Sequence, residues 1–152
     1  MPLQSNRIRH FVNYHNPKVM EHDFTSVNTF GILTNKRVRD LPGDIVWMIG
    51  RKDSSAAYWL YGRFRVNHAG LTDDSFFRYE VQGVDGYWFR PPMRLDTESW
   101  FPELLKCTAN FSTGFQSIKD DILVKGLQSC HTRHKNAANS AVTSASSQRV
   151  HD

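Results

Sequence analysis

Residues 58–66, YWLYGRFRV, combine aromatic rings with two arginines at a spacing that could recognise a ligand. Side chains alternate between the two faces of a strand, so an extended chain here would gather four of them on one face. These four are Trp59, Tyr61, Arg63 and Arg65. Aromatic rings stack on unpaired or extruded bases, and arginines hold phosphates. The equally weighted alternative is that both rings pack under a helix while the arginines reach water.

Other residues could extend the same chemistry. Two predicted turns contribute further cations, which are Lys36, Arg37 and Arg39 in one turn and Arg51 and Lys52 in the other. Two more indoles, Trp47 and Trp88, could form the wall of a pocket, although core packing is the simpler interpretation for Trp47. The polar residues at strand ends could hydrogen-bond a base edge, although each also suits a turn or cap; they are Asn13, His15, Thr34 and Asn35.

The sequence contains no motif for catalysis. GxSxG, P-loop, GxGxxG, HExxH and HNH-like patterns are all absent. The histidines are scattered without acids at helical spacing, and the adjacent Asp120 and Asp121 would point apart. Cys107 and Cys130 are too few for a disulfide framework and lack zinc-site spacing. We therefore expect this chain to have no enzymatic activity, no metal and no cofactor.

The composition suits one folded domain. The chain has 152 residues, of which 39% are apolar and 22% charged, and its aromatic residues can supply much of a core. A formal net charge of +4 suits a polyanionic partner such as nucleic acid. No apolar run approaches the roughly 20 residues that span a bilayer, and the start lacks a signal-peptide pattern. We expect a cytoplasmic protein without membrane contact.

Hydrophobic patterning predicts a chain of short strands with few helices. The predicted strands are 7–15, 28–34, 44–50, 56–67, 76–83 and 86–91, and the predicted helices are 98–107 and 117–128. The Asp-Gly pair within residues 84–86 predicts a hairpin between the last two strands. So many short strands in a small chain tend to curl or close into a barrel. The predicted fold is α+β, with five to six curled strands and short flanking helices.

The composition changes near the C-terminus. Residues 129–152 contain no aromatic residue and few large aliphatic residues. Such a segment buries too little apolar area to offset the entropy of ordering it. We therefore expect a folded domain at 1–128 and a disordered polar tail at 129–152.

The order of these motifs resembles the PUA-like superfamily, in particular its EVE and YTH types of domain. The resemblance rests on HFVNYHN, then FGILTNKRVRDLPGDIVWMIG, then YWLYGRFRV, and it covers about residues 7–125. A basic segment leads into Gly43 and Asp44 and then into an apolar strand, as in those domains. The chain departs from the family at residues 13–16, where NYHN replaces a Lys-Ser-Glu-Pro-like segment.

The resemblance implies a PUA-like curled barrel that binds nucleic acid and holds one modified base, such as methylated or hydroxymethylated cytosine in DNA. Similar bacterial domains are attached to modification-dependent HNH-type endonucleases, which implies a restriction or defence context. The candidate cage walls are Trp47, Trp59, Tyr61 and Trp88, of which not all can serve, and Trp59 is the first choice. The implied base-edge contacts are Asn13, His15, Thr34 and Asn35, and the implied phosphate contacts are Lys36, Arg37, Arg39, Arg51, Lys52, Arg63 and Arg65.

Two other functions fit the same residues. A PUA-type RNA-binding module would prefer structured RNA and ignore DNA modification. A protein-interaction barrel, for example a phage-encoded inhibitor, would bind with little dependence on salt, whereas binding through phosphates weakens steeply as salt rises.

Overall fold

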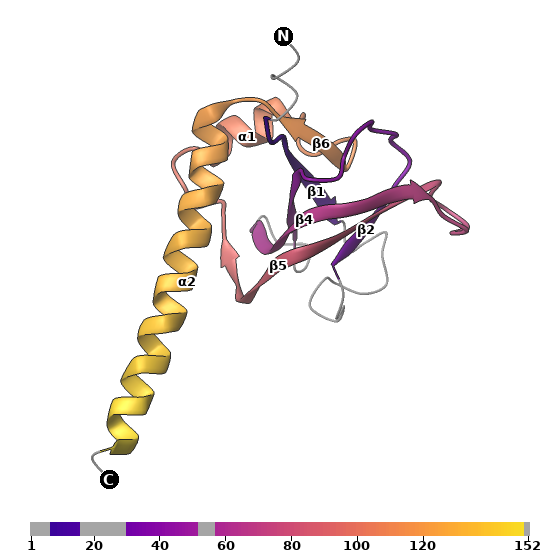
Figure 1. Ribbon diagram of the computed structural model, residues 1–152. Helices are drawn as coiled ribbons and strands as arrows, with labels where there is room; N and C mark the ends of the chain where they lie inside the picture. The colour runs from indigo at the N-terminus through magenta and orange to yellow at the C-terminus, as the bar shows by residue number, and fades with distance from the viewer. Residues whose placement is uncertain (1–6, 16–29, 52–56, 151–152) are drawn as a thin grey trace.

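A computed structural model describes residues 7–15, 30–51 and 57–150 and shows one sheet flanked by two helices (Figure 1). Its strands are β1 (His10–His15), β2 (Gly31–Thr34), β3 (Ile45–Gly50), β4 (Trp59–Leu71), β5 (Tyr79–Arg94) and β6 (Phe115–Ile118). Its helices are α1 (Phe101–Cys107) and α2 (Asp121–Val150). None of the helices in these ranges is long and apolar enough to cross a membrane.

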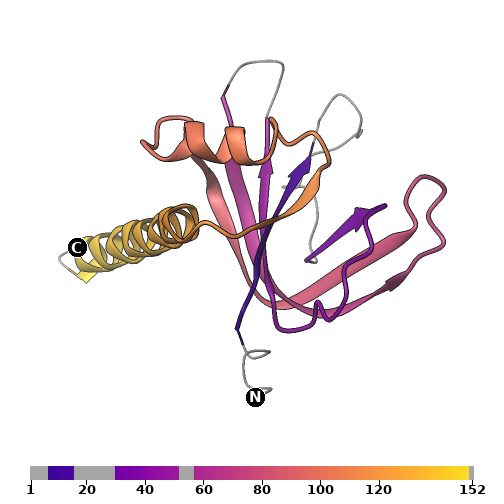
Figure 2. The same cartoon turned by 90° about the horizontal axis from the view of Figure 1, so that it is seen from above.

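The sheet is mixed and strongly curled. The strand order is β2-β5-β4-β3-β1-β6, in which β1 and β3 run parallel and the other neighbours run antiparallel. The long strands β4 and β5 bend together, so the sheet wraps into a half-barrel (Figure 2). The predicted α+β class with a curled sheet is confirmed at this level.

The two faces of the sheet carry separate hydrophobic clusters. In β3, Ile45, Trp47 and Ile49 belong to one cluster, whereas Val46 and Met48 belong to the other. We call the first the outer cluster, because it includes buried residues of α1 and α2. The second is the inner cluster, and among the described residues no member of it comes from a helix. The described helices therefore pack on one face of the sheet. The other face lies inside the curl of the sheet (Figure 2).

A β-bulge interrupts β4 at Tyr61. Against β3, Leu60 pairs with Ile49 and Gly62 pairs with Met48, so Tyr61 is an extra residue in β4 relative to β3. An extra residue of this kind reverses the alternation of side chains beyond it.

The bulge separates the rings from the arginines, so the prediction that they share one face is wrong. Trp59 and Tyr61 belong to the inner cluster together with Phe64. Arg63 instead lies over Trp47 on the outer face, with its guanidinium carbon 5.2 Å from the ring centroid. Simple alternation could not show this, because a bulge depends on pairing with a distant strand.

The predicted hairpin at Asp85-Gly86 is also wrong, since β5 runs straight through it. Against β4, Val84 pairs with Arg65 and Tyr87 pairs with Arg63, so the Asp-Gly pair adds one residue to β5. Asp85 takes the left-handed conformation with φ of 50°. Because β5 continues to pair with β4, the Asp-Gly pair forms a second β-bulge instead of a turn.

Helix α2 extends through most of the predicted tail. It continues past residue 129 to Val150, and in Figure 1 it projects well beyond the sheet. Cys130 is fully buried in the outer cluster, and His134 hydrogen-bonds a residue of β5. The tail boundary at 129 is therefore wrong for residues 130–134, because composition alone misses anchoring by a cysteine and by histidines.

Candidate nucleic-acid interface

The inner face brings together five of the predicted site residues. Strand alternation and the inner cluster place them there; they are Asn13, Thr34, Trp59, Tyr61 and Trp88. The two small polar residues are buried, with 7% and 5% exposure, so this face is not purely apolar. Among the described residues, the cluster that Trp59 joins contains strand and loop residues only, so no described helix covers this ring.

Trp59 is half-buried at the edge of this face. It opens β4, opposite Gly50 of β3 and Arg94 of β5, at the margin of the inner cluster. No aromatic ring in the part of the chain that the structure describes stacks on it. Tyr61, by contrast, is only 2% exposed. Trp59 can therefore offer a ring face to a ligand, whereas Tyr61 supports the core.

Trp88 is packed on both sides. Phe30 stacks on its ring at 4.8 Å between centroids, and Gly62 lies against it so closely that an added Cβ would meet the ring at 3.1 Å. The Arg90 guanidinium lies 5.7 Å from the same ring. Trp88 is therefore a structural neighbour of the site rather than an open wall.

Trp47 cannot share a cage with Trp59, because it lies on the opposite face of the sheet. It is completely buried, and its indole N–H donates a 3.0 Å hydrogen bond to Nδ1 of His10. Of the four candidate cage walls, Trp47 is therefore separated from the others, and Trp59, the first choice, lies on the inner face with Tyr61 and Trp88.

A cleft of about 600 Å³ opens at the other end of the same face. Three predicted phosphate-binding residues, Lys36, Arg37 and Arg39, line it. Its apolar lining includes four members of the inner cluster, which are Val38, Leu41, Ala69 and Val81. The basic cleft therefore borders the same buried cluster that Trp59 packs against.

Trp59 does not line this cleft. Ala69, which does, follows Trp59 by ten residues along the bent strand β4, a path of roughly 33 Å at the rise of an extended strand. The exposed cations and Trp59 therefore lie at separate places on the sheet rather than in one pocket.

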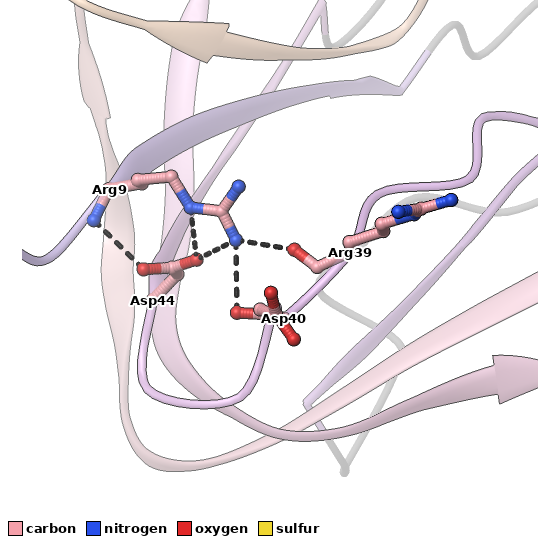
Figure 3. Close-up of polar contacts among 4 residues, drawn as sticks. All are labelled: Arg9, Arg39, Asp40 and Asp44. Atoms are coloured by element: carbon pink, nitrogen blue, oxygen red, sulfur yellow. Dashed lines mark hydrogen bonds and ion pairs between the residues drawn. The ribbon is translucent and has the colours of Figure 1, made fainter. Parts of the chain in front are cut away.

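An arginine-carboxylate clamp holds the basic turn in place (Figure 3). The Arg9 backbone N–H and Nε each donate a 2.8 Å hydrogen bond to Asp44, and Nη2 lies 2.7 Å from the same carboxylate. Nη2 also donates to the carbonyl oxygens of Arg39 and Asp40, at 2.7 and 2.9 Å. Gly43, at φ of 101°, supplies a backbone conformation that other residues rarely adopt. The Gly-Asp motif thus shapes the turn that presents the cations.

Replacing Asp44 with alanine is expected to lower the free energy of unfolding by about 2–3 kcal/mol. The change leaves several Arg9 donors without their acceptor; the cost is below that of a fully buried pair because the Arg9 side chain is 43% exposed. Urea denaturation measures it. Asp40→Asn is the matched control, since that side chain is exposed and asparagine tolerates its φ of 57°. Equal destabilisation by both variants would contradict the clamp.

The remaining predicted phosphate contacts do not gather at this face. The Arg51 guanidinium lies 5.6 Å from the ring of Tyr58, a residue packed against the outer cluster. Arg63 is on the outer face, and Arg65 is exposed between two inner residues of β4 and so points outward. Lys52 lies outside the described residues.

Two of the predicted base-edge residues have other positions. The side-chain oxygen of Asn35 accepts a 2.9 Å hydrogen bond from the backbone N–H of Arg78, which ties the β4–β5 connection to the end of β2. His15 pairs with Gly50 in the register of β1 and β3, and its side chain lies outside the described part.

The outer face carries a histidine cluster that was not predicted from the sequence. His131 of α2 contacts the rings of Tyr87 and Trp47, with centroids 4.7 and 6.3 Å away. The ring of His134 bridges the Tyr87 hydroxyl, at 2.6 Å, and the Pro91 carbonyl, at 2.8 Å. The tautomer of His134 with its proton on Nε2 satisfies both contacts. The Tyr87 hydroxyl then donates to Nδ1, and Nε2–H donates to the Pro91 carbonyl. These contacts hold residues 131–134 of α2 to β5.

Burial lowers the pKa of His131 to about 4, with smaller contributions from the positive charge of Arg63 and Lys135 and from His134. The pKa of His10 is also lowered, first by burial and then by Arg63. His131 is therefore neutral at physiological pH, and protonating it would place a charge among rings and cations.

Acid is expected to destabilise the protein through His131. Its folded pKa lies below the ordinary value of 6.5, so the unfolded chain binds the proton first. The contribution of neutral His131 to the free energy of unfolding is fully present above about pH 6.5 and is lost as the pH falls toward about 4. We expect a loss of about 1 kcal/mol, since the ring is partly exposed.

The matched variant is His131→Phe, which keeps a ring in place and removes the titration. Urea unfolding at neutral pH and at about pH 5 should show a smaller acid loss for the variant than for the natural sequence. Equal losses would show that His131 does not carry the effect.

The described residues include no group of three or more His, Cys, Asp or Glu side chains arranged to hold a metal ion. No protein-family model matches the chain, and neither does any curated protein.

Proposed function

We propose that this chain binds nucleic acid at the margins of the inner face of its sheet. The observation that carries the proposal is that the basic cleft and Trp59 border the same buried cluster. Cations that hold phosphates and a ring that stacks on a base are the two elements that binding of an unpaired or extruded nucleotide requires. The nucleic acid would contact the cleft at one margin and Trp59 at the other, since the cluster between them is buried.

The modified-base reader of the PUA-like type, in a restriction or defence context, is the specific form that we propose. A modified cytosine would leave the DNA stack and lie on Trp59. Burying one methyl group contributes only about 1 kcal/mol, so strong discrimination needs a polar contact. Asn13 is the described residue best suited to this, since it is polar, buried and on the inner face beside Met48.

A titration of the whole chain with three oligonucleotides tests the proposal. The set is a DNA duplex with one 5-methylcytosine or 5-hydroxymethylcytosine, its unmodified copy, and a structured RNA of similar length. We expect the modified duplex to bind several-fold more tightly than the unmodified one, with affinity falling as salt rises.

Other outcomes of this titration favour the alternatives. Tighter binding of RNA without any effect of DNA modification would favour an RNA-binding module. The absence of binding to all three at low salt would rule out the proposed function.

A further inference from the structure

The most exposed large hydrophobic side chains of the described chain lie at one end of the β4–β5 hairpin. Phe76 is 82% exposed, and Leu71 is 74% exposed. Exposed rings are unfavourable in water, so a ring held at this position calls for a partner that covers it.

The hairpin tip that carries Phe76 has a defined structure. The carboxylate of Asp74 accepts hydrogen bonds of 2.8 and 2.9 Å from the backbone N–H groups of Phe76 and Phe77. The backbone N–H of Thr72 donates to the carbonyl oxygen of Arg78 at 3.0 Å, which closes the loop. Because these contacts fix the backbone, the ring loses little further conformational freedom when a partner binds.

The tip lies directly beyond the basic cleft. Leu71 and Tyr79 form the last pair of the β4–β5 ladder, and both line the cleft. The hydrogen bond from Arg78 to Asn35 fastens the tip to the residue that precedes Lys36. Figure 2 shows this end of the hairpin extending past β2 at the open side of the curl. A strand held in the cleft would therefore pass close to the tip.

We propose that Phe76, supported by Leu71, is a wedge that stacks on an unstacked base of the strand whose phosphates the cleft holds. The proposal rests on the proposed function. A base fits better than a phosphate at this point, because the tip also carries Asp73 and Asp74, which repel phosphates. The cations of the cleft would hold the backbone on one side while the ring meets the base.

The test compares Phe76→Ala with Phe76→Trp by anisotropy titration with single-stranded DNA over a range of salt concentrations. We expect Phe76→Ala to weaken binding by about 5- to 100-fold without changing the salt dependence. Phe76→Trp should keep both the affinity and the salt dependence. Ile122→Ala is the matched control, since Ile122 is 70% exposed on α2, and it should change neither.

Two further variants separate this proposal from the function on which it rests. Asp73→Asn should tighten binding by about 2-fold if the tip meets the nucleic acid, because it removes a repelling charge. If Phe76→Ala binds like the natural sequence while Lys36→Gln, Arg37→Gln and Arg39→Gln together weaken binding, the wedge is wrong and the function stands. If none of these variants alters binding, both fail.

Discussion

Exchanging the three cations of the cleft for glutamine is expected to weaken nucleic-acid binding by about 100-fold at physiological salt. The combined variant is Lys36→Gln, Arg37→Gln and Arg39→Gln. These side chains are exposed, so the fold should persist, and the clamp from Arg9 uses only the backbone carbonyl of Arg39. Each lost phosphate contact should also reduce the slope of log affinity against log salt by about 1. Titrations over a range of salt concentrations measure both effects.

A triple variant on the helical side is the control for this experiment. Lys106, Lys119 and Lys125 are exposed residues of α1, α2 and the segment between them. Their replacement by glutamine removes the same net charge from the other side of the molecule, and we expect a loss of less than about 5-fold. Equal losses for the two triple variants would show that binding follows overall charge rather than the cleft.

Trp59→Ala is expected to weaken binding by about 5- to 150-fold, which corresponds to the loss of stacking on one base. Trp59→Phe should retain most of the affinity, since a ring remains. The salt dependence should not change, because no phosphate contact is removed. Titration by anisotropy measures the affinity, and an accompanying urea curve confirms that the variant is folded under the same conditions.

Trp100→Ala is the matched control for the loss of an indole. Trp100 is also half-buried, and it packs on the helical side, where an added Cβ on Gly126 would meet its ring at 2.5 Å. We expect this variant to lose stability and to keep its affinity for nucleic acid. A loss of affinity in Trp100→Ala as large as that in Trp59→Ala would mean that both act through stability.

Local pattern predicted much of the sheet, and tertiary pairing decided the rest. The apolar run at 45–50 is a buried strand as expected, because a short β-branched run has few alternatives. The extra residue at Tyr61 could not be predicted, because it exists only relative to Met48 and Ile49 on the neighbouring strand. The bulge at Asp85 could not be predicted either, because the Asp-Gly pair favours a turn locally but continued pairing with β4 keeps the chain extended.

The candidate site divides in a similar way. The basic segment at 36–39 was predicted as a phosphate site and does line a cleft, because clustered cations between strands stay at the surface. Of the four candidate cage walls, Trp47 cannot serve together with Trp59, since the two lie on opposite faces. The contact between His134 and Tyr87 joins residues 47 positions apart, and no local pattern indicates it.

Photocrosslinking tests most directly the central claim that nucleic acid contacts the margins of the inner face, at the cleft and at Trp59. A DNA strand with 5-iodouracil at successive positions would be bound to the chain and irradiated, and the crosslinked peptides identified by mass spectrometry. We predict crosslinks at Trp59 and at the cleft end of the hairpin, at Phe76 or Tyr79. Crosslinks found only on the helical side, at Tyr87 or Trp100, would contradict the account.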